Sequence, residues 1–374
     1  MTPDATRTDE CRAAGAASSS ATAITAQAGA KASAENFPVA LRFLPRRYRG
    51  HLAAVYGFAR SADDMGDEAA PGERLCLLDE LEADVGRLYR MVSRAGAPGG
   101  EGTSGEGTSG AGTSGAGTSG AGTSGEGPGS VDATGPSAAG PVTAGGPAGA
   151  GPASGGGPAG ARPVDADGSP PRLAVVRALA PAVVACAIPA QPFLDLIEAN
   201  RQDQVVSRYP TYRDLLAYCR LSANPVGRLV LHIFGAATPE REALSDQVCT
   251  ALQLAEHWQD VAEDLRAGRI YLPLEDMDRF GCTERDLAAP HATPTVRALI
   301  AFEERRARDL LDAGAPIVGT LRGAARVAVA GYVAGGRAAL AAIAASGHDV
   351  LCGTPRPAKA RVVTELVRAY ATGR

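Results

Sequence analysis

Apolar side chains recur every three or four residues along several stretches of the chain. In ERLCLLDELEADVGRLYRMV, residues 73–92, they stand at Leu75, Leu78, Leu81, Val85, Leu88 and Val92, which form one stripe of a helix. The same period runs through 211–235, 245–267, 296–315 and 320–345. Long β-branched alternation is absent, so the pattern predicts an all-α fold.

Two segments lack this pattern. Residues 1–33 are rich in Ala, Ser and Thr, and residues 97–171 hold tandem EGTSG and AGTSG pentapeptides followed by a Gly-, Pro- and Ala-rich stretch. Such compositions cannot bury enough apolar surface to offset the entropy of an ordered chain. We expect a disordered tail at 1–33, a flexible insert at 97–171, and one helical domain built from 34–96 together with 172–374.

The insert contains a false dinucleotide-binding motif. Gly110, Gly112 and Gly115 satisfy G-x-G-x-x-G. A nucleotide-binding glycine turn needs a strand before it and a helix after it, and the repeats supply neither. The chain offers no other sign of a nicotinamide site.

Charge and cysteine content narrow the class of protein. A net charge of −4 argues against nucleic-acid binding. The seven cysteines form no C-x-x-C pair, so we expect reduced thiols and a cytoplasmic location. No run of about 20 apolar residues predicts a membrane span. The chain has no polybasic anchor either, so any contact with the inner membrane face is expected to be peripheral.

Two acidic clusters suggest a site for metal ions. ARSADDMGDE, residues 59–68, places Asp63 and Asp67 on one helical face, and Glu256, Asp260 and Asp264 repeat that spacing in a second helix. A single cluster is ordinary for a solvated helix face. Two facing clusters can hold Mg²⁺, which binds few protein ligands and bridges to substrate phosphates.

Two other metal sites fit the sequence poorly. A di-iron carboxylate bundle needs paired Glu-x-x-His motifs, and none occurs. The five histidines are not spaced as zinc ligands, so they are expected to be structural or surface residues.

The two acidic motifs resemble those of the squalene and phytoene synthases. They read YGFARSADDMGDE at 56–68 and QLAEHWQDVAEDLRAGRIYLP at 253–273. The stretches ENFPVALRFLP, RYPTYRDLLAYCRLSANPVGRLVLHIFG and VAGGRAAL are similar to the hydroxysqualene synthase branch. Phytoene synthases usually have Arg before the first Asp of the second motif, whereas this chain has Gln259.

The resemblance implies a single isoprenoid synthase domain with a central active-site cavity. It implies a prenyl diphosphate substrate, presqualene diphosphate, whose diphosphate leaves and whose cation is captured by water as hydroxysqualene. It also implies a sister presqualene diphosphate synthase that supplies the substrate and a reductase that consumes the product.

The resemblance also assigns roles to residues at the matching motif positions. Asp63, Asp67, Asp260 and Asp264 would hold Mg²⁺, and Glu256 stands where the family usually has Asn. Tyr56, Arg60 and Tyr209 would act on the reacting group. Arg60, Arg228, Gln253, Asn224, Arg269 and Tyr271 would bind the substrate.

Two alternatives stay open. A condensing synthase would itself join two prenyl diphosphates to squalene or phytoene. A non-catalytic protein would bind a prenyl lipid or scaffold a sister enzyme, although both Asp pairs that catalysis needs are intact.

Overall fold

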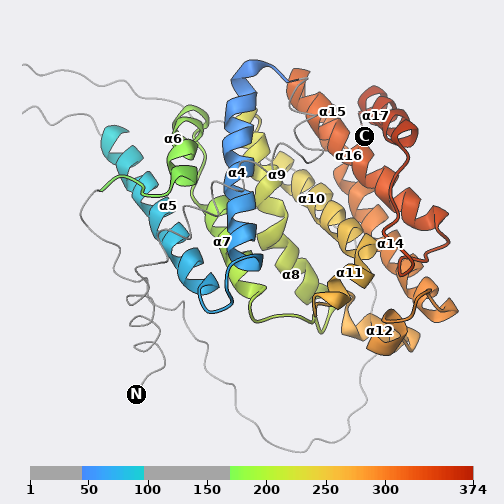
Figure 1. Cartoon of the computed structure of the whole chain (residues 1–374). Coiled ribbons are helices and arrows are strands. Elements are labelled where there is room, and N and C mark those ends of the chain that lie inside the picture. The colour runs from blue at the N-terminus through green and yellow to red at the C-terminus, as the bar shows by residue number, and fades with distance from the viewer. Residues whose placement is uncertain (1–43, 97–168, 374) are drawn as a thin grey trace, which may run out of the picture. The chain divides into compact units, whose positions relative to one another are not determined.

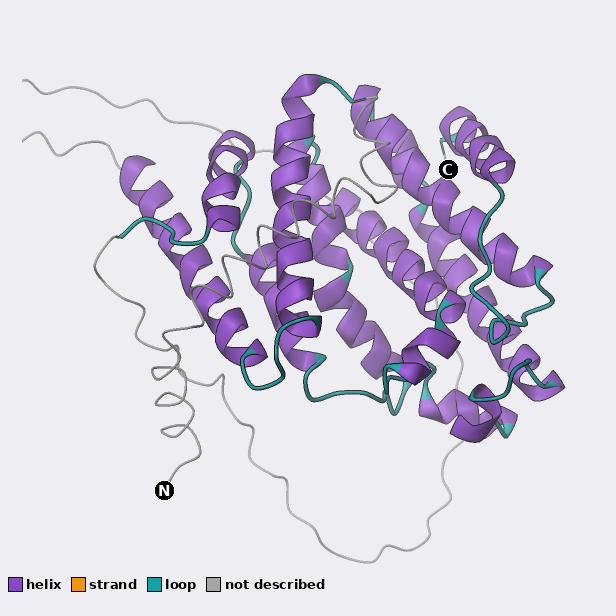
Figure 2. Ribbon diagram, in the orientation of Figure 1, coloured by secondary structure: helices purple, strands orange, loops and turns teal. Residues whose placement is uncertain are grey.

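The computed structural model describes residues 44–96 and 169–373, and within these ranges the chain is helical and forms no strand (Figure 2). The one ladder contact there is an isolated parallel bridge between Arg208 and Ile270. The helices are α4 (Arg46–Asp67), α5 (Arg74–Gly96), α6 (Ala174–Cys186), α7 (Gln191–Gln202), α8 (Tyr212–Ser222), α9 (Asn224–Ile233), α10 (Pro239–Gln259), α11 (Val261–Arg266), α12 (Leu274–Phe280), α13 (Glu284–Leu287), α14 (Pro294–Gly314), α15 (Ile317–Thr320), α16 (Gly323–Ala345) and α17 (Lys359–Thr372). The all-α prediction is therefore confirmed.

The tail and most of the insert, 1–43 and 97–168, lie outside the described residues. All described residues belong to one compact unit. The sequence-based division into tail, domain and insert stays a prediction.

Local sequence signals explain where the long helices begin. Thr238 and Thr293 accept hydrogen bonds from the backbone N–H groups of Arg241 and Val296, and a proline follows each threonine in the first helical turn. Thr211 and Asp214 form a reciprocal capping box at the start of α8. These caps place the starts of α8, α10 and α14 close to where the apolar periods begin.

The buried side chains form two clusters. The first, called here the α4 core, joins α4, α5, α6, α7 and part of α9. The second, the α10 core, joins α8, α10, α14, α16 and another side of α9. Figure 1 shows α4 near α5, α6 and α7, while α10 runs beside α14 and α16. The two acidic motifs therefore belong to different cores.

Two predicted helices are interrupted. The stretch 211–235 divides at Ala223 into α8 and α9, because Pro225 has no N–H to continue α8 and stands in the first turn of α9, where no such N–H is needed. The stretch 245–267 divides at Asp260, whose backbone leaves helical geometry with φ −105° and ψ 16°. The spacing predicts that Glu256, Asp260 and Asp264 lie on one unbroken helix. This prediction is wrong, because the helix breaks at Asp260.

Two further features concern membranes and thiols. By length and composition alone α16 could cross a membrane, but 44% of its apolar window is buried against other helices. The described cysteines 186, 219, 249, 282 and 352 are free thiols, as expected. Cys76 is disulfide-bonded, so the expectation of reduced thiols is wrong there.

Candidate active site

The first acidic row lies on one face of α4. Tyr56, Arg60, Asp63 and Asp67 are spaced by four, three and four residues, which keeps them on that face. The Arg60 Nε atom lies 2.9 Å from Asp64 Oδ1, and this carboxylate is almost fully buried. Arg60 therefore neutralises a buried neighbour of the row as well as standing beside Asp63.

Asn200 on α7 fixes the position of Asp63. Its Nδ2 group donates to Asp63 Oδ1 at 3.1 Å and to the Leu196 carbonyl at 3.1 Å. A Cβ atom at Gly66 would stand 2.6 Å from Asn200 Oδ1. Glycine at position 66 thus lets α7 approach α4 closely enough for this amide to reach the acidic row.

The second acidic row surrounds the break after α10. Asp260 Oδ1 accepts a hydrogen bond from Thr354 Oγ1 at 3.2 Å, and Gln259 donates to the carbonyl of Pro355. The segment after α16 therefore covers Asp260. Gly268, with φ +82°, stands just after the C-cap of α11 and ends that helix.

The two rows face each other. Arg269 Nη2 lies 2.8 Å from Asp67 Oδ1, which links the end of the second motif to the first. Burial raises the pKa of Glu256, and the charges of Asp260 and Asp63 raise it further. Glu256 and Asp63 come from different helices, so the two rows lie near each other, and we call the region between them the recess.

The carboxylates of the recess repel one another. Burial raises the pKa of Asp63 to about 6 against the hydrogen bond from Asn200, and Asp67 adds repulsion. Burial and the charge of Asp260 raise the pKa of Asp264 to about 7. The Asp63 side chain is nevertheless accessible to water. Its carboxylate is therefore reached by water but lies close to enough protein for like charges to interact more strongly than on an open surface.

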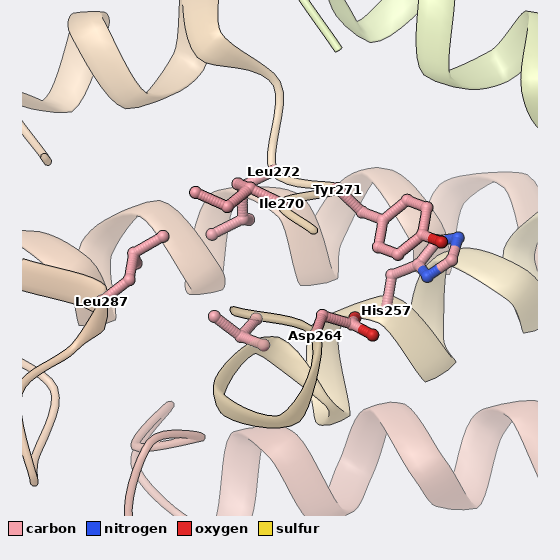
Figure 3. Close-up of a pocket in the computed structure, with 7 residues that line it drawn as sticks. His257, Asp264, Ile270, Tyr271, Leu272 and Leu287 are labelled. Carbon is pink, nitrogen blue, oxygen red and sulfur yellow. The ribbon is translucent and has the colours of Figure 1, made fainter. Parts of the chain in front are cut away.

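An aromatic wall borders the recess. The His257 ring stacks on Tyr271 with ring centres 3.7 Å apart, and Tyr209 and Tyr218 lie within 6 Å of Tyr271. Figure 3 shows Tyr271 and His257 beside the Asp264 carboxylate, at the edge of a small pocket that Leu272 and other apolar side chains complete. Burial lowers the pKa of His257 to about 3, so its ring is neutral.

Asp203 belongs to this region as well. Its Oδ2 atom accepts a hydrogen bond from the Tyr218 hydroxyl at 2.8 Å. Burial raises the pKa of Asp203 to about 6, and the nearby charges of Asp67 and Asp63 contribute. It is thus a further carboxylate close to the first acidic row.

An apolar cavity lies between α9, α10, α15 and α16. Its empty volume is about 460 Å³ including space open to solvent. The lining residues are Val226, Gly227, Val230, Leu231, Ser245, Val248, Cys249, Leu252, Ile317, Val329 and Tyr332. Such a cavity suits hydrocarbon.

Two predicted substrate-binding residues lie away from the acidic rows. Asn224 is buried, and its side-chain oxygen accepts a hydrogen bond from Thr250 at 2.9 Å. Arg228 forms a two-pronged ion pair with Asp246. Asp246 precedes Asp260 by almost four turns of α10, or about 20 Å. The structure thus uses Asn224 and Arg228 to join α9 to α10. A role of Arg228 in binding the diphosphate stays a prediction.

The other predicted residues do gather near the recess. Gln253 Nε2 lies 3.3 Å from His257 Nε2, one turn before the second acidic row. Tyr209 and Tyr271 belong to the aromatic wall, and Arg269 contacts Asp67. The sequence missed Asn200, Asp203, Tyr218 and Thr354 because each stands outside the two acidic motifs.

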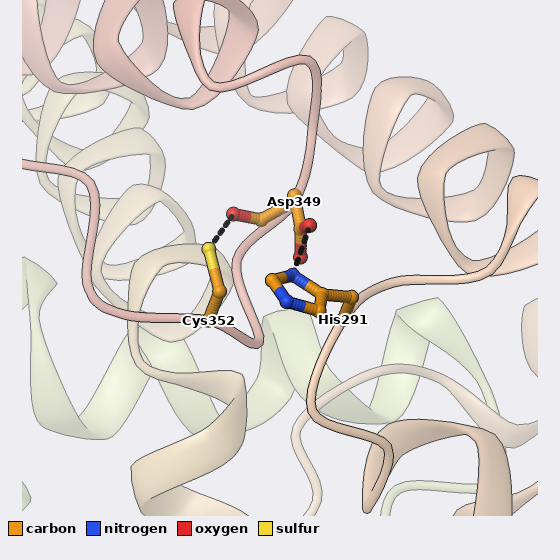
Figure 4. Close-up of side chains that lie close together, drawn as sticks. All are labelled: His291, Asp349 and Cys352. Atoms are coloured by element: carbon orange, nitrogen blue, oxygen red, sulfur yellow. Dashed lines mark hydrogen bonds and ion pairs between the residues drawn. The ribbon is translucent and has the colours of Figure 1, made fainter.

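The segment that covers Asp260 is anchored at Asp349. This carboxylate accepts hydrogen bonds from the Ala292 backbone at 2.9 Å and from Arg297 at 2.6 Å. Figure 4 shows His291 and Cys352 on either side of Asp349. The three could suit a cation by proximity. Because Arg297 already neutralises Asp349, we interpret the group as a structural anchor.

The donor set of the recess fits Mg²⁺. Its carboxylates are hard oxygen donors, and they repel one another in the absence of a cation. Asp63, Asp67, Glu256, Asp260 and Asp264 are the residues that would hold the metal.

The raised pKa values predict a falling stability with pH for the metal-free protein. The folded-state pKa values of Asp63 and Asp264, about 6 and 7, exceed the ordinary value of 3.8. Between these values the folded state binds protons that the unfolded chain has lost, so raising the pH favours unfolding. In EDTA, Tm is expected to fall by about 5 °C between pH 5 and pH 8, measured by scanning fluorimetry.

Adding Mg²⁺ is expected to reverse most of this fall in Tm. A smaller fall should remain with Mg²⁺ present, because burial also raises the pKa of Glu303, next to Arg306, to about 8. Asp264→Asn is the matched variant and should flatten the slope in EDTA. A Tm that stays constant or rises from pH 5 to pH 8 in EDTA would contradict the repulsion among the carboxylates of the recess.

Comparisons with known proteins agree with this architecture. The sequence model of squalene/phytoene synthases matches residues 30–109 and 150–367. The crystal structure of squalene synthase HpnC from Alicyclobacillus acidocaldarius is 34% identical, with a TM-score of 0.61, and the match covers 88% of this chain and 95% of that one. A dehydrosqualene synthase structure, 20% identical with a TM-score of 0.63, shares the fold.

Hydroxysqualene synthases are among the relatives. The protein of Sinorhizobium fredii is 26% identical over 291 residues, which cover 77% of this chain and 72% of that protein. The protein of Zymomonas mobilis is 40% identical over 119 residues, which cover 32% of this chain and 40% of that protein. The chain thus matches less than half the length of the second relative. The family match spans well over half of the chain, and the protein belongs to the squalene/phytoene synthases, which act on prenyl diphosphates and generally use a divalent metal.

Proposed function

We propose that the protein converts presqualene diphosphate and water into hydroxysqualene and diphosphate, with Mg²⁺ held by the two acidic rows. The observation that carries the proposal is the meeting of these rows across one recess, with Arg269 joined to Asp67 and Glu256 coupled to Asp63. The relatives named hydroxysqualene synthase support the choice of reaction.

The residues of the recess have separate tasks in this reaction. Bound Mg²⁺ would supply positive charge to the departing diphosphate. Arg269 adds a fixed positive charge near Asp67, and Asn200 holds Asp63 in place. The carbon–oxygen bond to diphosphate breaks, and its electron pair leaves with the diphosphate.

The aromatic wall would protect the resulting cation. The buried rings of Tyr209, Tyr218 and Tyr271 would keep bulk water from this side of the cation and offer it no strong nucleophile. The neutral His257 ring adds no opposing charge. After the cyclopropylcarbinyl cation rearranges, a water oxygen bonds to carbon and releases a proton. The apolar cavity beside α10 would take hydrocarbon chain.

A second candidate is a condensing reaction of two prenyl diphosphates. The phytoene synthase of Daucus carota is 32% identical over 200 residues, which cover 52% of this chain and 50% of that protein. The Gln259 side chain donates to the Pro355 carbonyl, so the residue that replaces the phytoene synthase Arg has a structural partner.

A product assay distinguishes the candidates. Purified protein with Mg²⁺ is given farnesyl diphosphate or presqualene diphosphate, with and without NADPH, and the lipids are identified by mass spectrometry. Hydroxysqualene from presqualene diphosphate alone is the expected result. A product from farnesyl diphosphate would instead establish condensation, and no product from either substrate would favour a non-catalytic prenyl-lipid-binding protein.

The reaction also predicts functional partners. A sister synthase must supply presqualene diphosphate, and a reductase must remove the hydroxyl group of the product.

A further inference from the structure

The outer face of α17 carries an apolar stripe that no helix within residues 44–96 and 169–373 covers. Val363, Val367 and Tyr370 are 59%, 63% and 44% exposed, and their spacing of four and three residues places them on one face. The adjoining face carries Ala369 and Leu366, which pack into the α10 core. Figure 1 shows α17 at the edge of the described helices. The helix is therefore anchored to the domain and presents Val363, Val367 and part of Tyr370 to solvent, with the Arg326 guanidinium lying over the Tyr370 ring.

Basic side chains surround this stripe. Lys359, Arg361 and Arg368 are exposed on α17, and Arg356 is exposed just before it. The one acid from Cys352 to Thr372 is Glu365, which is only 8% exposed and lies 3.9 Å from both Arg361 and Arg368. This surface is positive, whereas the chain as a whole carries −4.

We propose that α17 docks the protein on an anionic lipid bilayer, with Val363, Val367 and Tyr370 entering the headgroup region. An interfacial helix needs a shallow apolar face bordered by Lys and Arg, and Tyr is favoured at this depth. Each basic residue near an anionic surface adds attraction that salt weakens.

The charges and the size of the stripe disfavour protein occupants. A two-fold contact between copies would set Lys359, Arg361 and Arg368 against the same residues of the other copy. Three side chains are also far fewer than the 20 to 30 residues on each side of a stable protein interface.

The docking site connects to the apolar cavity through one helix. α17 packs on α16, and Arg326 of α16 donates to the Tyr370 carbonyl at 2.5 Å. Val329 and Tyr332 of the same helix line the cavity. Docking by α17 would therefore hold a wall of the cavity close to the bilayer, where long-chain prenyl compounds dissolve.

Vesicle cosedimentation tests the proposal without substrate, so its failure is separate from failure of the proposed reaction. The full chain is mixed with phosphatidylcholine vesicles, with or without phosphatidylglycerol, at low and high salt. Wild-type protein is expected to bind the anionic vesicles, and less at high salt. The double variant Val363→Asp/Val367→Asp should lose about tenfold or more in affinity, and Lys359→Gln/Arg361→Gln about tenfold.

Val184→Asp is the matched control, because Val184 is 63% exposed on α6. It should bind vesicles as wild type does, and all variants should keep their helical circular dichroism and Tm. The proposal is overturned if wild-type protein ignores anionic vesicles, if the α17 variants bind as well as Val184→Asp, or if Val363→Asp/Val367→Asp instead converts a dimer into monomers in sedimentation velocity.

Discussion

Replacing Asp63 by Asn is expected to lower turnover at least about a thousandfold while the protein remains folded. The amide keeps the size of the carboxylate but cannot supply the charge that holds a cation. It also removes repulsion with Asp67, so Tm of the metal-free variant at pH 7.5 should equal or exceed that of wild type. Asp260→Asn should lose activity similarly. Turnover of presqualene diphosphate and the Mg²⁺-dependent rise in Tm are the two measurements.

Asp312→Asn provides the control for this loss. Asp312 is exposed and pairs with Arg337 at 2.8 Å, much as Asp67 pairs with Arg269, but it lies on α14 outside the recess. Its activity should stay within about twofold of wild type, as for most exposed surface pairs. Near-normal turnover by both Asp63→Asn and Asp260→Asn would refute the metal-holding role of the rows.

Gly314→Val is expected to give the largest loss of stability, about 3 kcal/mol or more in the free energy of unfolding. A Cβ atom at Gly314 would lie 2.7 Å from the Leu244 carbonyl oxygen and 2.9 Å from the Val248 nitrogen. Both are backbone atoms of α10, so the clash can be relieved only by moving α14 away from the helix that carries the second acidic row. Urea unfolding followed by circular dichroism measures the loss.

Gly331→Ala is the matched change on α16. No atom lies within 4 Å of the Cβ that it adds, so the better helix propensity of alanine should stabilise the protein by about 0.5–1 kcal/mol. If Gly314→Val unfolds at the same urea concentration as wild type, the close packing of α10 on α14 is wrong.

The sequence predicted those features that depend on local periodicity. The stripe from Leu75 to Val92 became α5, and the Asp63–Asp67 spacing gave one face of α4 because that helix is unbroken. For the second row, the sequence predicted the acidic residues but not the helix break at Asp260. Asp260 breaks its helix where Thr354 and Pro355 contact it, and residues so distant in the chain leave no periodic signal near Asp260.

The same limit applies to the surroundings of the predicted site. Arg228 looked available because its partner, Asp246, lies on the next helix. Asn200 and Asp203 went unnoticed because their roles depend on the packing of α7 against α4, which Gly66 permits. The motifs therefore located the site, while the residues that orient and neutralise it emerged only from tertiary contacts.

The separation of the α4 core from the α10 core has a mechanical consequence. Each core is held together by its own buried side chains, whereas the facing carboxylates repel across the recess between them. The two cores also meet where α7 packs on α8 and where α16 side chains contact the α4 core, and Arg269 bridges them to Asp67. A bound cation would add one more tie between the cores, at the place where their own negative charges push them apart.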